Sequence, residues 1–254
     1  MAEVMLHAPP FDVSMPPRYR QLFRGPVVSE HAAIVARCGA AAAHAEIWRR
    51  THQGTAIACM VTRDHPWLLS FVCTALDAHA IHMSAAHVYA RACPQGSDLV
   101  CLLWLIREDS PERSVVDSDV ARIAELVGGL VTGELTLEVI PPEARRGIPP
   151  DTATLIRFEP TGDASTSLLV VETLERPGLF RAVTAALQAA HVRILKSLVA
   201  TAPEGHVVHR FVLSEQDGRM PDSLRKNRLQ AEVLRVISAI APATSRRLAR
   251  QANA

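Results

Sequence analysis

The sequence predicts an α+β protein with two tandem ferredoxin-like domains, each with the strand and helix order βαββαβ, preceded by a short N-terminal arm and helix. The first observation behind this prediction is an internal repeat, in which the segment from Met60 aligns with the segment from Val171. The second is that both copies show the same order of apolar patterns, those of a strand, a helix, a β-hairpin and a second helix. That order is typical of a sheet covered by two helices on one face.

Matching residues place the two copies in register. With Met60 on Val171, the aligned pairs are Pro66 and Pro177, Leu68 and Leu179, Ala75 and Ala186, Leu76 and Leu187, and Ile81 and Val192. We call this constant separation the repeat offset. Further along, each copy reaches a Pro-x-Gly turn, at 94–96 in the first and 203–205 in the second, where the separation is smaller by two. We therefore expect the hairpin of the first copy to be two residues longer than that of the second.

Each element of the repeat has a residue pattern of its own. A short apolar run bounded by charged or turn-forming residues predicts the first strand. A proline is expected in the first turn of the helix that follows, because its missing amide hydrogen does no harm there. The expected elements are strands 56–62 and 167–174, helices from Pro66 and Pro177, hairpins 81–89 with 99–106 and 192–200 with 207–213, and closing helices 119–131 and 224–240.

The sequence leaves open which strand completes each sheet. Residues 135–140 can supply a last strand for the first copy, whereas the second copy has no clear equivalent after Ile240. Alternatively, each copy owns a preceding strand, at 45–49 and at 153–159, that pairs with its first strand as a hairpin.

Proline marks the predicted boundaries between domains. The connector at 141–150 holds too much proline for the interior of a helix or strand. The N-terminal arm to about Pro26 is also proline-rich and is expected to be mobile, until Ser29, as an N-cap, begins a helix through His44. The predicted divisions are an arm and helix at 1–44, a first domain at 45–141, a linker at 142–152, a second domain at 153–242 and a tail at 243–254.

The composition argues against several classes of function. Hydrophobic residues make up 48% of the 254 residues and charged residues 21%, so a packed core is expected rather than disorder. The formal net charge of +1 provides no field that gathers phosphates, and the basic run 246–250 lacks aromatic residues to stack on bases, so we expect no nucleic-acid partner. No apolar run reaches the roughly 18 residues of a membrane span. Five cysteines without CxxC spacing indicate buried thiols, so we expect a cytoplasmic protein outside membranes.

Two short motifs carry a resemblance to a known family. The junctions between first strand and first helix, Asp64-His65-Pro66-Trp67-Leu68 and Glu175-Arg176-Pro177-Gly178-Leu179, resemble the D-x-P-G-L/I signature of ACT domains, the second more closely than the first. The segment 155–179 is similar to the C-terminal tandem ACT region of the PII-protein uridylyltransferase/uridylyl-removing enzymes. The resemblance covers about 45–240, and neither a nucleotidyltransferase motif nor the histidine and His-Asp pair of a metal-dependent phosphohydrolase is found. We therefore expect no catalytic residues, no cofactor and no enzyme activity.

The resemblance implies an amino-acid ligand, with glutamine as the implied signal, bound beside the junction and between paired domains. Physical chemistry supports such a site, because the first amide hydrogens of a helix lack intrahelical partners and attract a carboxylate. Gly178 lets a ligand approach the backbone, and Glu175 can meet an ammonium group. The predicted ligand-binding residues at the junctions are Glu175, Arg176, Pro177, Gly178, Leu179 and Phe180 in the second copy, and Asp64, His65, Trp67 and Leu68 in the first.

Other candidate contacts depend on how the strands face. His82, Ser84, Lys196 and Ser197 lie on the facing strands, where they either reach the amide or carboxylate of a ligand or face solvent. Trp67 replaces the glycine of the motif, so its indole blocks the first site, covers it, or packs against a neighbouring domain. For both junctions the alternative is that proline and glycine only shape a turn.

A metal site and a cysteine nucleophile are not expected. Strand alternation places His82 and His87 on opposite faces, and His79 lies near the end of the preceding helix. Cys73 lies inside an apolar helical run, with no base at a suitable spacing.

These observations favour a regulatory protein that senses an amino acid, forms a homodimer, and passes a ligand-dependent change in domain packing to a signalling or metabolic protein. The alternative is an adaptor built from tandem ACT domains that binds no ligand and acts by protein contact, resembling the tandem-ACT repressor partners of the glycine-cleavage system. A divergent fragment of the uridylyltransferase is a third hypothesis, for which we find no nucleotide site in the sequence.

Overall fold

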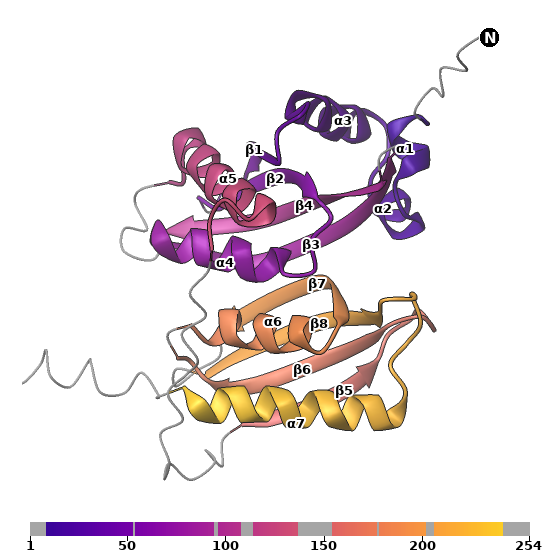
Figure 1. Cartoon of the computed structure of the whole chain (residues 1–254), viewed down its shortest axis with the longest axis vertical. Helices are drawn as coiled ribbons and strands as arrows, with labels where there is room; N and C mark the ends of the chain where they lie inside the picture. Colours follow the sequence, from indigo (N-terminus) through magenta and orange to yellow (C-terminus); the bar gives the residue numbers. More distant parts are fainter. Residues whose placement is uncertain are drawn as a thin grey trace, which may run out of the picture. The chain divides into compact units, whose positions relative to one another are not determined.

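The computed structural model describes residues 9–52, 54–93, 96–107, 114–136, 154–176, 178–201 and 206–240. Within these ranges the chain is a mixed α+β protein with antiparallel strand pairing, as the sequence predicts. It divides into two compact units, residues 1–136 and 137–254, and each is described by itself (Figure 1). No helix among the described residues combines the length and the apolar character needed to cross a membrane.

The first unit has a four-stranded antiparallel sheet with the strand order β1-β2-β4-β3. Helices α4 and α5 cover one face of this sheet, and α1, α2 and α3 cover the other, which we call the N-terminal face (Figure 1). Its elements are α1 (Phe11–Ser14), α2 (Pro17–Leu22), α3 (Pro26–Cys38), β1 (Ala43–Arg50), β2 (Ala56–Arg63), α4 (Leu68–Ala78), β3 (Ile81–Cys93), β4 (Gly96–Arg107) and α5 (Asp117–Thr132).

The second unit repeats this arrangement. Its sheet has the order β7-β8-β6-β5, again antiparallel, and α6 and α7 cover one face (Figure 1). Its elements are β5 (Leu155–Pro160), β6 (Ser167–Leu174), α6 (Leu179–Ala189), β7 (Val192–Thr201), β8 (His206–Glu215) and α7 (Ser223–Ala239).

The repeat offset holds in the fine detail of the backbone. Strands β2 and β6, and helices α4 and α6, begin and end at residues related by this offset. Ala80 and His191, the non-glycine residues with positive φ (52° and 57°) in the described part of the chain, are related by it too, each between a helix and the next strand. A bulge follows Met83 in β3 and Ile194 in β7, at the same separation. The repeat therefore extends to local irregularities of the chain.

The returning strands of the two hairpins depart from the expected alignment. Ala56 pairs with Leu105, and its equivalent Ser167 pairs with Leu213. This pairing makes the first hairpin three residues longer than the second, not two. Aligning the Pro-x-Gly turns predicted the wrong difference in hairpin length, because strand register is set by the pairing and not by the turn residues.

The strand that completes each sheet is the preceding one. β1 pairs with β2 and β5 pairs with β6, both antiparallel, so the described order is ββαββα and not the expected βαββαβ. Of the alternative strand at 135–140, Leu135 and Thr136 are not in a strand, and 137–140 lie outside the described residues, as does the predicted linker at 142–152. A short hairpin turn, closed by a 2.9 Å bond from the Thr51 amide to the Thr55 carbonyl, explains the preference for β1, because local strand pairs form readily.

The N-terminal helix differs from the predicted one at both ends. It begins at Pro26, not Ser29, because Gly25 (φ 59°) makes the turn and proline suits the first helical position. It ends at Cys38, where Gly39 (φ 53°) breaks it, and Ala43 and His44 already belong to β1. The preceding arm, expected to be mobile, contains the short helices α1 and α2.

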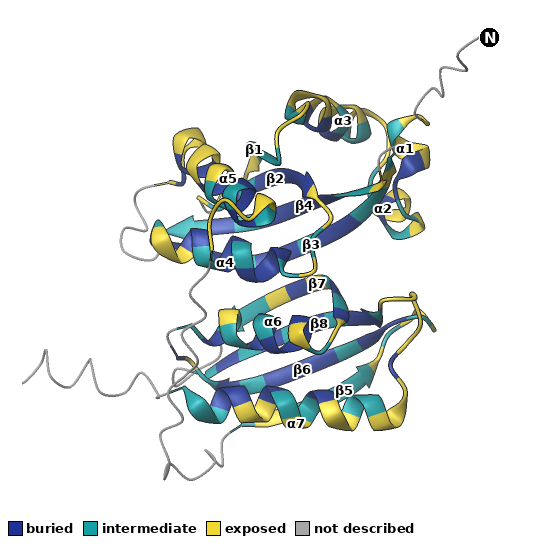
Figure 2. Ribbon diagram, in the orientation of Figure 1, coloured by how far each residue is buried: buried dark blue, intermediate teal, exposed yellow. Residues whose placement is uncertain are grey.

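An aromatic core fixes these N-terminal helices to the sheet. Tyr19 of α2 is fully buried, and its ring lies 5.2 Å from that of Tyr89 on β3, measured between centroids. Ile34 and Val35 of α3 belong to the same cluster. Figure 2 shows buried residues along α3 and along the strands of the sheet. Burial of such rings contributes much of the stabilisation of a small unit. Helices of the same chain thus cover the N-terminal face.

Candidate functional site

In the second unit, Arg176 anchors the strand-to-helix junction. Its side chain is 3% exposed, and its Nη1 donates to the carbonyl oxygens of Ile237 at 2.8 Å and Ile240 at 3.1 Å. These carbonyls lie at the C-terminal end of α7, where backbone acceptors lack helical partners and the helix dipole is negative. Arg176 therefore has a structural role at a position predicted to contact ligand.

The turn at this junction depends on Gly178. Its φ of 76° lies in the left-handed region, and it forms the N-cap of α6, whose buried Leu179 donates its amide to the Arg176 carbonyl at 3.0 Å. Glu175 is exposed and its Oε1 accepts the Arg176 amide at 3.1 Å. Pro177, also predicted as a ligand contact, lies outside the described residues.

Phe180 of α6 packs against β8 in a stack that the sequence did not indicate. Its ring centroid lies 5.6 Å from those of His209 and of Phe211, both buried on β8. Ser197 is buried on β7 opposite Phe211 in the strand register, whereas Lys196 is exposed. The structure thus separates these two predicted contacts: Ser197 lies in the core and Lys196 lies in solvent.

In the first unit, side chains at the junction between β2 and α4 contact other residues of the junction and of α4. α4 begins at Leu68, two residues after the proline expected in its first turn. The ring Nδ1 of His65 accepts the Trp67 amide at 3.1 Å, and the His65 ring lies 4.8 Å from that of Phe71. Burial lowers the pKa of His65 below its ordinary value, so the ring is neutral at neutral pH and serves as an acceptor. Trp67 is half-buried and Leu68 is buried.

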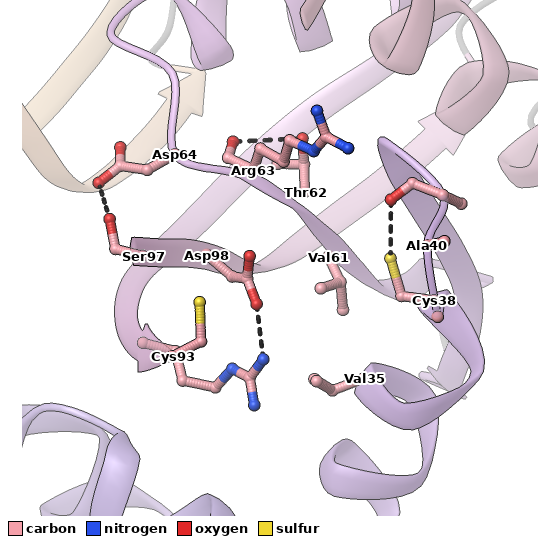
Figure 3. A pocket seen from close by; sticks show the side chains of 13 residues that line it. Val35, Cys38, Ala40, Val61, Thr62, Arg63, Asp64, Cys93, Ser97 and Asp98 are labelled. Atoms are coloured by element: carbon pink, nitrogen blue, oxygen red, sulfur yellow. Dashed lines mark hydrogen bonds and ion pairs between the residues drawn. The ribbon is translucent and has the colours of Figure 1, made fainter. Parts of the chain in front are cut away.

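Asp64 is the residue of the first junction that reaches a cavity. Its backbone amide donates to the Ser97 carbonyl at 3.1 Å, and the Ser97 hydroxyl donates to Asp64 Oδ2 at 2.6 Å (Figure 3). These bonds join the end of β2 to the start of β4. Asp64 and Ser97 are both among the residues that line this cavity.

This cavity has a volume of about 670 Å³ and lies on the N-terminal face, where α3 ends. We call it the α3 cavity. Its wall is apolar at Val35, Ala40, Ala41 and Val61, and carries the half-buried thiols of Cys38 and Cys93 (Figure 3). Its charged lining residues are Arg63, Asp64, Arg91 and Asp98. The volume is within the range of small-molecule sites.

Cross-strand pairing builds the charged end of the α3 cavity. Asp98 on β4 is the register partner both of Arg63 on β2 and of Arg91 on β3, so the three side chains share one face of the sheet. Arg91 Nη2 lies 2.5 Å from Asp98 Oδ2. Sequence reasoning missed Arg63, Arg91 and Asp98, because their proximity follows from the register of three strands that are distant in sequence.

The bulge in β3 overturns one argument about the histidines. With Ser84 as the extra residue, His82 pairs with Ile106 and His87 with Leu102, so both histidines face the same side of the sheet and not opposite sides. Ser84 Oγ is within 3.5 Å of the Trp104 carbonyl, away from the α3 cavity lining. Among the described residues, no group of three His, Cys, Asp or Glu side chains is placed to hold a metal ion.

Comparison with known proteins gives a distant relative. No protein-family model matches the chain. The chain is 27% identical over 148 residues to the bifunctional uridylyltransferase/uridylyl-removing enzyme of Nitrobacter winogradskyi, in a match that covers 57% of this chain and 16% of the enzyme. The chain thus spans less than a fifth of the length of that curated relative. This likeness supports a relation between the chain and one region of that enzyme.

A solved structure is also similar in part. A crystal structure of an unknown protein from Galdieria sulphuraria is 16% identical and covers 70% of this chain and 85% of that protein. The TM-score of 0.19 is too low to support an argument about fold or function.

Proposed function

We propose that this chain is a regulatory protein that senses an amino acid through two ACT-like modules of the ferredoxin-like type, with glutamine as the first candidate ligand. The observation that carries the proposal is the position of Asp64. It is the acid of the predicted junction motif, and it lies on the wall of a cavity large enough for an amino acid. An acidic side chain on the wall of such a cavity can contact a bound ligand directly, which a residue that only shapes a turn does not need to do.

The duplicated module supports a sensing role. The same ββαββα unit occurs twice, with an acid, Asp64 or Glu175, before the first helix of each. The related enzyme is one that adds and removes uridylyl groups, and the match spans only 16% of it. We propose that the shared region is regulatory, and that a homodimer and a protein partner complete the signalling function.

We propose no catalytic role for the cysteines. Burial raises the pKa of the Cys59 thiol to about 12 and raises that of Cys101 as well. A thiol with a raised pKa stays protonated near neutral pH, and the protonated thiol is a poor nucleophile. Cys73 is likewise buried within α4.

The second junction favours the adaptor hypothesis. Arg176 is committed to the carbonyls at the end of α7, and Phe180 is committed to the stack with His209 and Phe211. These internal contacts give Arg176 and Phe180 structural roles that do not involve a ligand. If only protein contact mattered, both units would serve as scaffolds without a small molecule.

A thermal-shift screen of the full chain against each standard amino acid at millimolar concentration separates the two functions. A ligand that binds the native state raises the unfolding temperature, as mass action requires. Stabilisation by one amino acid would support sensing, whereas no shift with any of them would favour the adaptor.

A pair of variants then tests the second junction. Gly178→Asp adds a negative charge that repels a carboxylate, and Gly178→Asn is its control, with similar size and the same backbone demand. If ligand stabilisation is lost in the aspartate variant alone, the ligand binds beside α6. If both variants keep it, the ligand binds elsewhere.

A further inference from the structure

The sheet of the second unit has one face on which no described helix of that unit lies. Helices α6 and α7 both cover the opposite face (Figure 1). We call the face without a helix the open face. Strand alternation and register place Leu155, Leu168, Val170, Leu198 and Val212 on it, and Leu155 is 50% and Leu198 38% exposed. Apolar side chains that share an exposed face are typical of a surface that another element covers.

The equivalent face of the first unit shows what kind of element covers it. By the repeat offset, Val170 corresponds to Cys59, which belongs to the same core cluster as Ile34 and Val35 of α3. α3 contacts both β1 and β2. The open face is therefore the counterpart of the N-terminal face, and the first unit covers that face with an amphipathic helix.

Two sets of polar contacts hold α3 on β1. The Arg37 guanidinium donates to both carboxylate oxygens of Glu46, at 2.5 and 2.7 Å. Glu30 Oε2 accepts Trp48 Nε1 at 2.7 Å and Arg49 Nη2 at 3.2 Å. Glu30 and Arg37 are seven residues apart, a spacing that places both on one side of a helix. An acid and a base of α3 thus match a base and an acid of β1.

On β5 the charges at the corresponding positions are reversed. Arg157 takes the place of Glu46, and Glu159 takes the place of Arg49. The correspondence follows from the strand partners of these residues, which are related by the repeat offset: Cys59 and Val170 for the first position, and Ile57 and Leu168 for the second. β5 therefore carries a base where β1 has an acid, and an acid where β1 has a base.

This reversal argues against α3 of a second copy as the cover of the open face. In the orientation that α3 has on β1, Arg37 would face Arg157, and Glu30 would face Glu159. Like charges that meet at an interface are unfavourable and reject the wrong partner. A helix with the opposite order of charges would instead meet a complementary charge at both positions.

The charged groups of β5 can accept such a partner. Arg157 already pairs with Glu159 and with Glu172, each at 2.7 Å, but the Arg157 and Glu159 side chains remain 38% and 39% exposed. A guanidinium has five N–H donors, and a carboxylate accepts several hydrogen bonds. Both groups can therefore bind a further charge while their mutual ion pair remains.

We propose that the open face binds an amphipathic helix of a partner protein, whose charges are the reverse of those of α3. That helix carries a lysine or arginine at the position of Glu30 and an aspartate or glutamate seven residues later. Between them, apolar residues at the positions of Ile34 and Val35 contact the apolar part of the face. The inference rests on the protein partner of the proposed function and deepens it by stating the chemistry of that partner.

Two synthetic peptides of the α3 sequence, residues 26–38, test the proposal on the full chain. Both carry Cys38→Ser and a hydrocarbon staple between positions 29 and 33, which are exposed in α3, because an isolated helix of this length is marginally stable. One peptide keeps Glu30 and Arg37, and the other carries Glu30→Lys and Arg37→Glu. In fluorescence anisotropy the reversed peptide binds about tenfold or more tightly than the native one. Equal binding of the two, or binding of neither, would overturn the proposal.

A charge exchange in the chain tests the contacts themselves. Arg157→Glu combined with Glu159→Arg keeps the net charge and is expected to reverse the preference between the two peptides. The control exchanges the ion pair of α7, as Glu232→Arg with Arg235→Glu, and leaves the preference unchanged. A preference that survives the exchange in β5 would show that these charges do not select the helix.

A matched pair of leucines gives a second test that keeps every charged pair of β5. Leu198 on the open face and Leu234 on α7 are almost equally exposed, at 38% and 39%. Leu198→Lys is expected to weaken binding of the reversed peptide by about tenfold, whereas Leu234→Lys leaves it unchanged. Equal effects of the two variants would place the peptide elsewhere.

Further measurements distinguish the alternatives. In sedimentation, a dimer that Leu198→Lys dissociates and Leu234→Lys does not would assign the open face to a second copy, and would overturn the partner helix. Stabilisation by an amino acid without binding of either peptide would overturn the partner helix and leave sensing intact. Binding of the reversed peptide without an effect of any amino acid would overturn sensing and leave the partner helix intact.

Discussion

The guanidinium of Arg176 lies 2.8 Å from the carbonyl oxygen of Ile237, 61 residues further along the chain. Through this bond, the junction between β6 and α6 holds the C-terminal end of α7. The contact joins the motif of the second unit to its closing helix, so a residue that resembles part of a binding motif also holds the fold together.

Replacing Arg176 with methionine is expected to destabilise the second unit by about 2 to 4 kcal/mol, because two carbonyls lose charged donors. All tryptophans and tyrosines lie in the first unit, at Trp48, Trp67, Trp104, Tyr19 and Tyr89. The loss should therefore appear in urea unfolding followed by far-ultraviolet circular dichroism, while the fluorescence transition stays in place. The control is Arg181→Met at an exposed position on α6. Equal effects of the two variants would contradict the structural role of Arg176.

Gly178→Ala is expected to cost about 1 kcal/mol of unfolding free energy, because a side chain disfavours the left-handed backbone. Space is not the cause, since an added Cβ would meet only Arg181 Nη2, at 3.8 Å. Gly162→Ala is the matched control, at an exposed glycine with nothing within 4 Å and no positive φ. Equilibrium unfolding by circular dichroism measures both, and a neutral Gly178→Ala would rule out backbone strain.

His31 is expected to make the first unit sensitive to acid. The ring is fully buried with Nδ1 2.7 Å from the Tyr19 hydroxyl oxygen, and burial lowers its pKa from 6.5 to about 4. Because the folded state takes up the proton at lower pH than the unfolded state, stability is full above about pH 6.5 and falls as the pH drops toward 4. Each pKa unit corresponds to about 1.4 kcal/mol.

Tryptophan fluorescence during urea unfolding measures this dependence in the first unit. His31→Gln should flatten the slope between about pH 6.5 and 4. His52→Gln, at an exposed histidine, should leave the slope unchanged. A slope that persists in His31→Gln would assign the acid sensitivity to other groups.

The five cysteines are expected to react with iodoacetamide in two classes. Cys38 and Cys93 are half-buried and should be modified in the native protein, whereas Cys59, Cys73 and Cys101 are buried and should react only after unfolding. Burial raises the pKa of Cys38, so its reaction should accelerate markedly above neutral pH. Peptide mass spectrometry of the native and unfolded protein gives the order, and early modification of Cys59 would show that the N-terminal helices open.

Local patterns predicted the repeated elements because each pattern has a local cause. Apolar residues at helical spacing indicated α4 and α6, and apolar runs indicated β2 and β6. The start of α3 was missed because a proline-rich segment is typical of an arm, although proline at Pro26 suits a helix start. The bulges at Ser84 and Leu195 were also missed, since an extra residue in one strand depends on the partner strand.

The candidate site was predictable only in part. Asp64 was identified from the junction motif, but Arg63, Arg91 and Asp98 were not, because two of them belong to a long hairpin whose register no single segment determines. The structural role of Arg176 was hidden for a similar reason, since its partners are carbonyls at the far end of the second unit. Every residue has a main-chain carbonyl, so the identity of a residue does not show which side chain donates to it.

The sequence by itself determined the duplicated module, the repeat offset of its first strand and first helix, and the acid before each first helix, because these depend on short-range periodicity and on turn residues. Only the tertiary structure decided which strand closes each sheet, how α3 covers the N-terminal face, and how Arg63, Arg91 and Asp98 come to line one cavity. Those features depend on contacts between residues far apart in the chain. Their free energy comes from burial and pairing across elements, which no local pattern records.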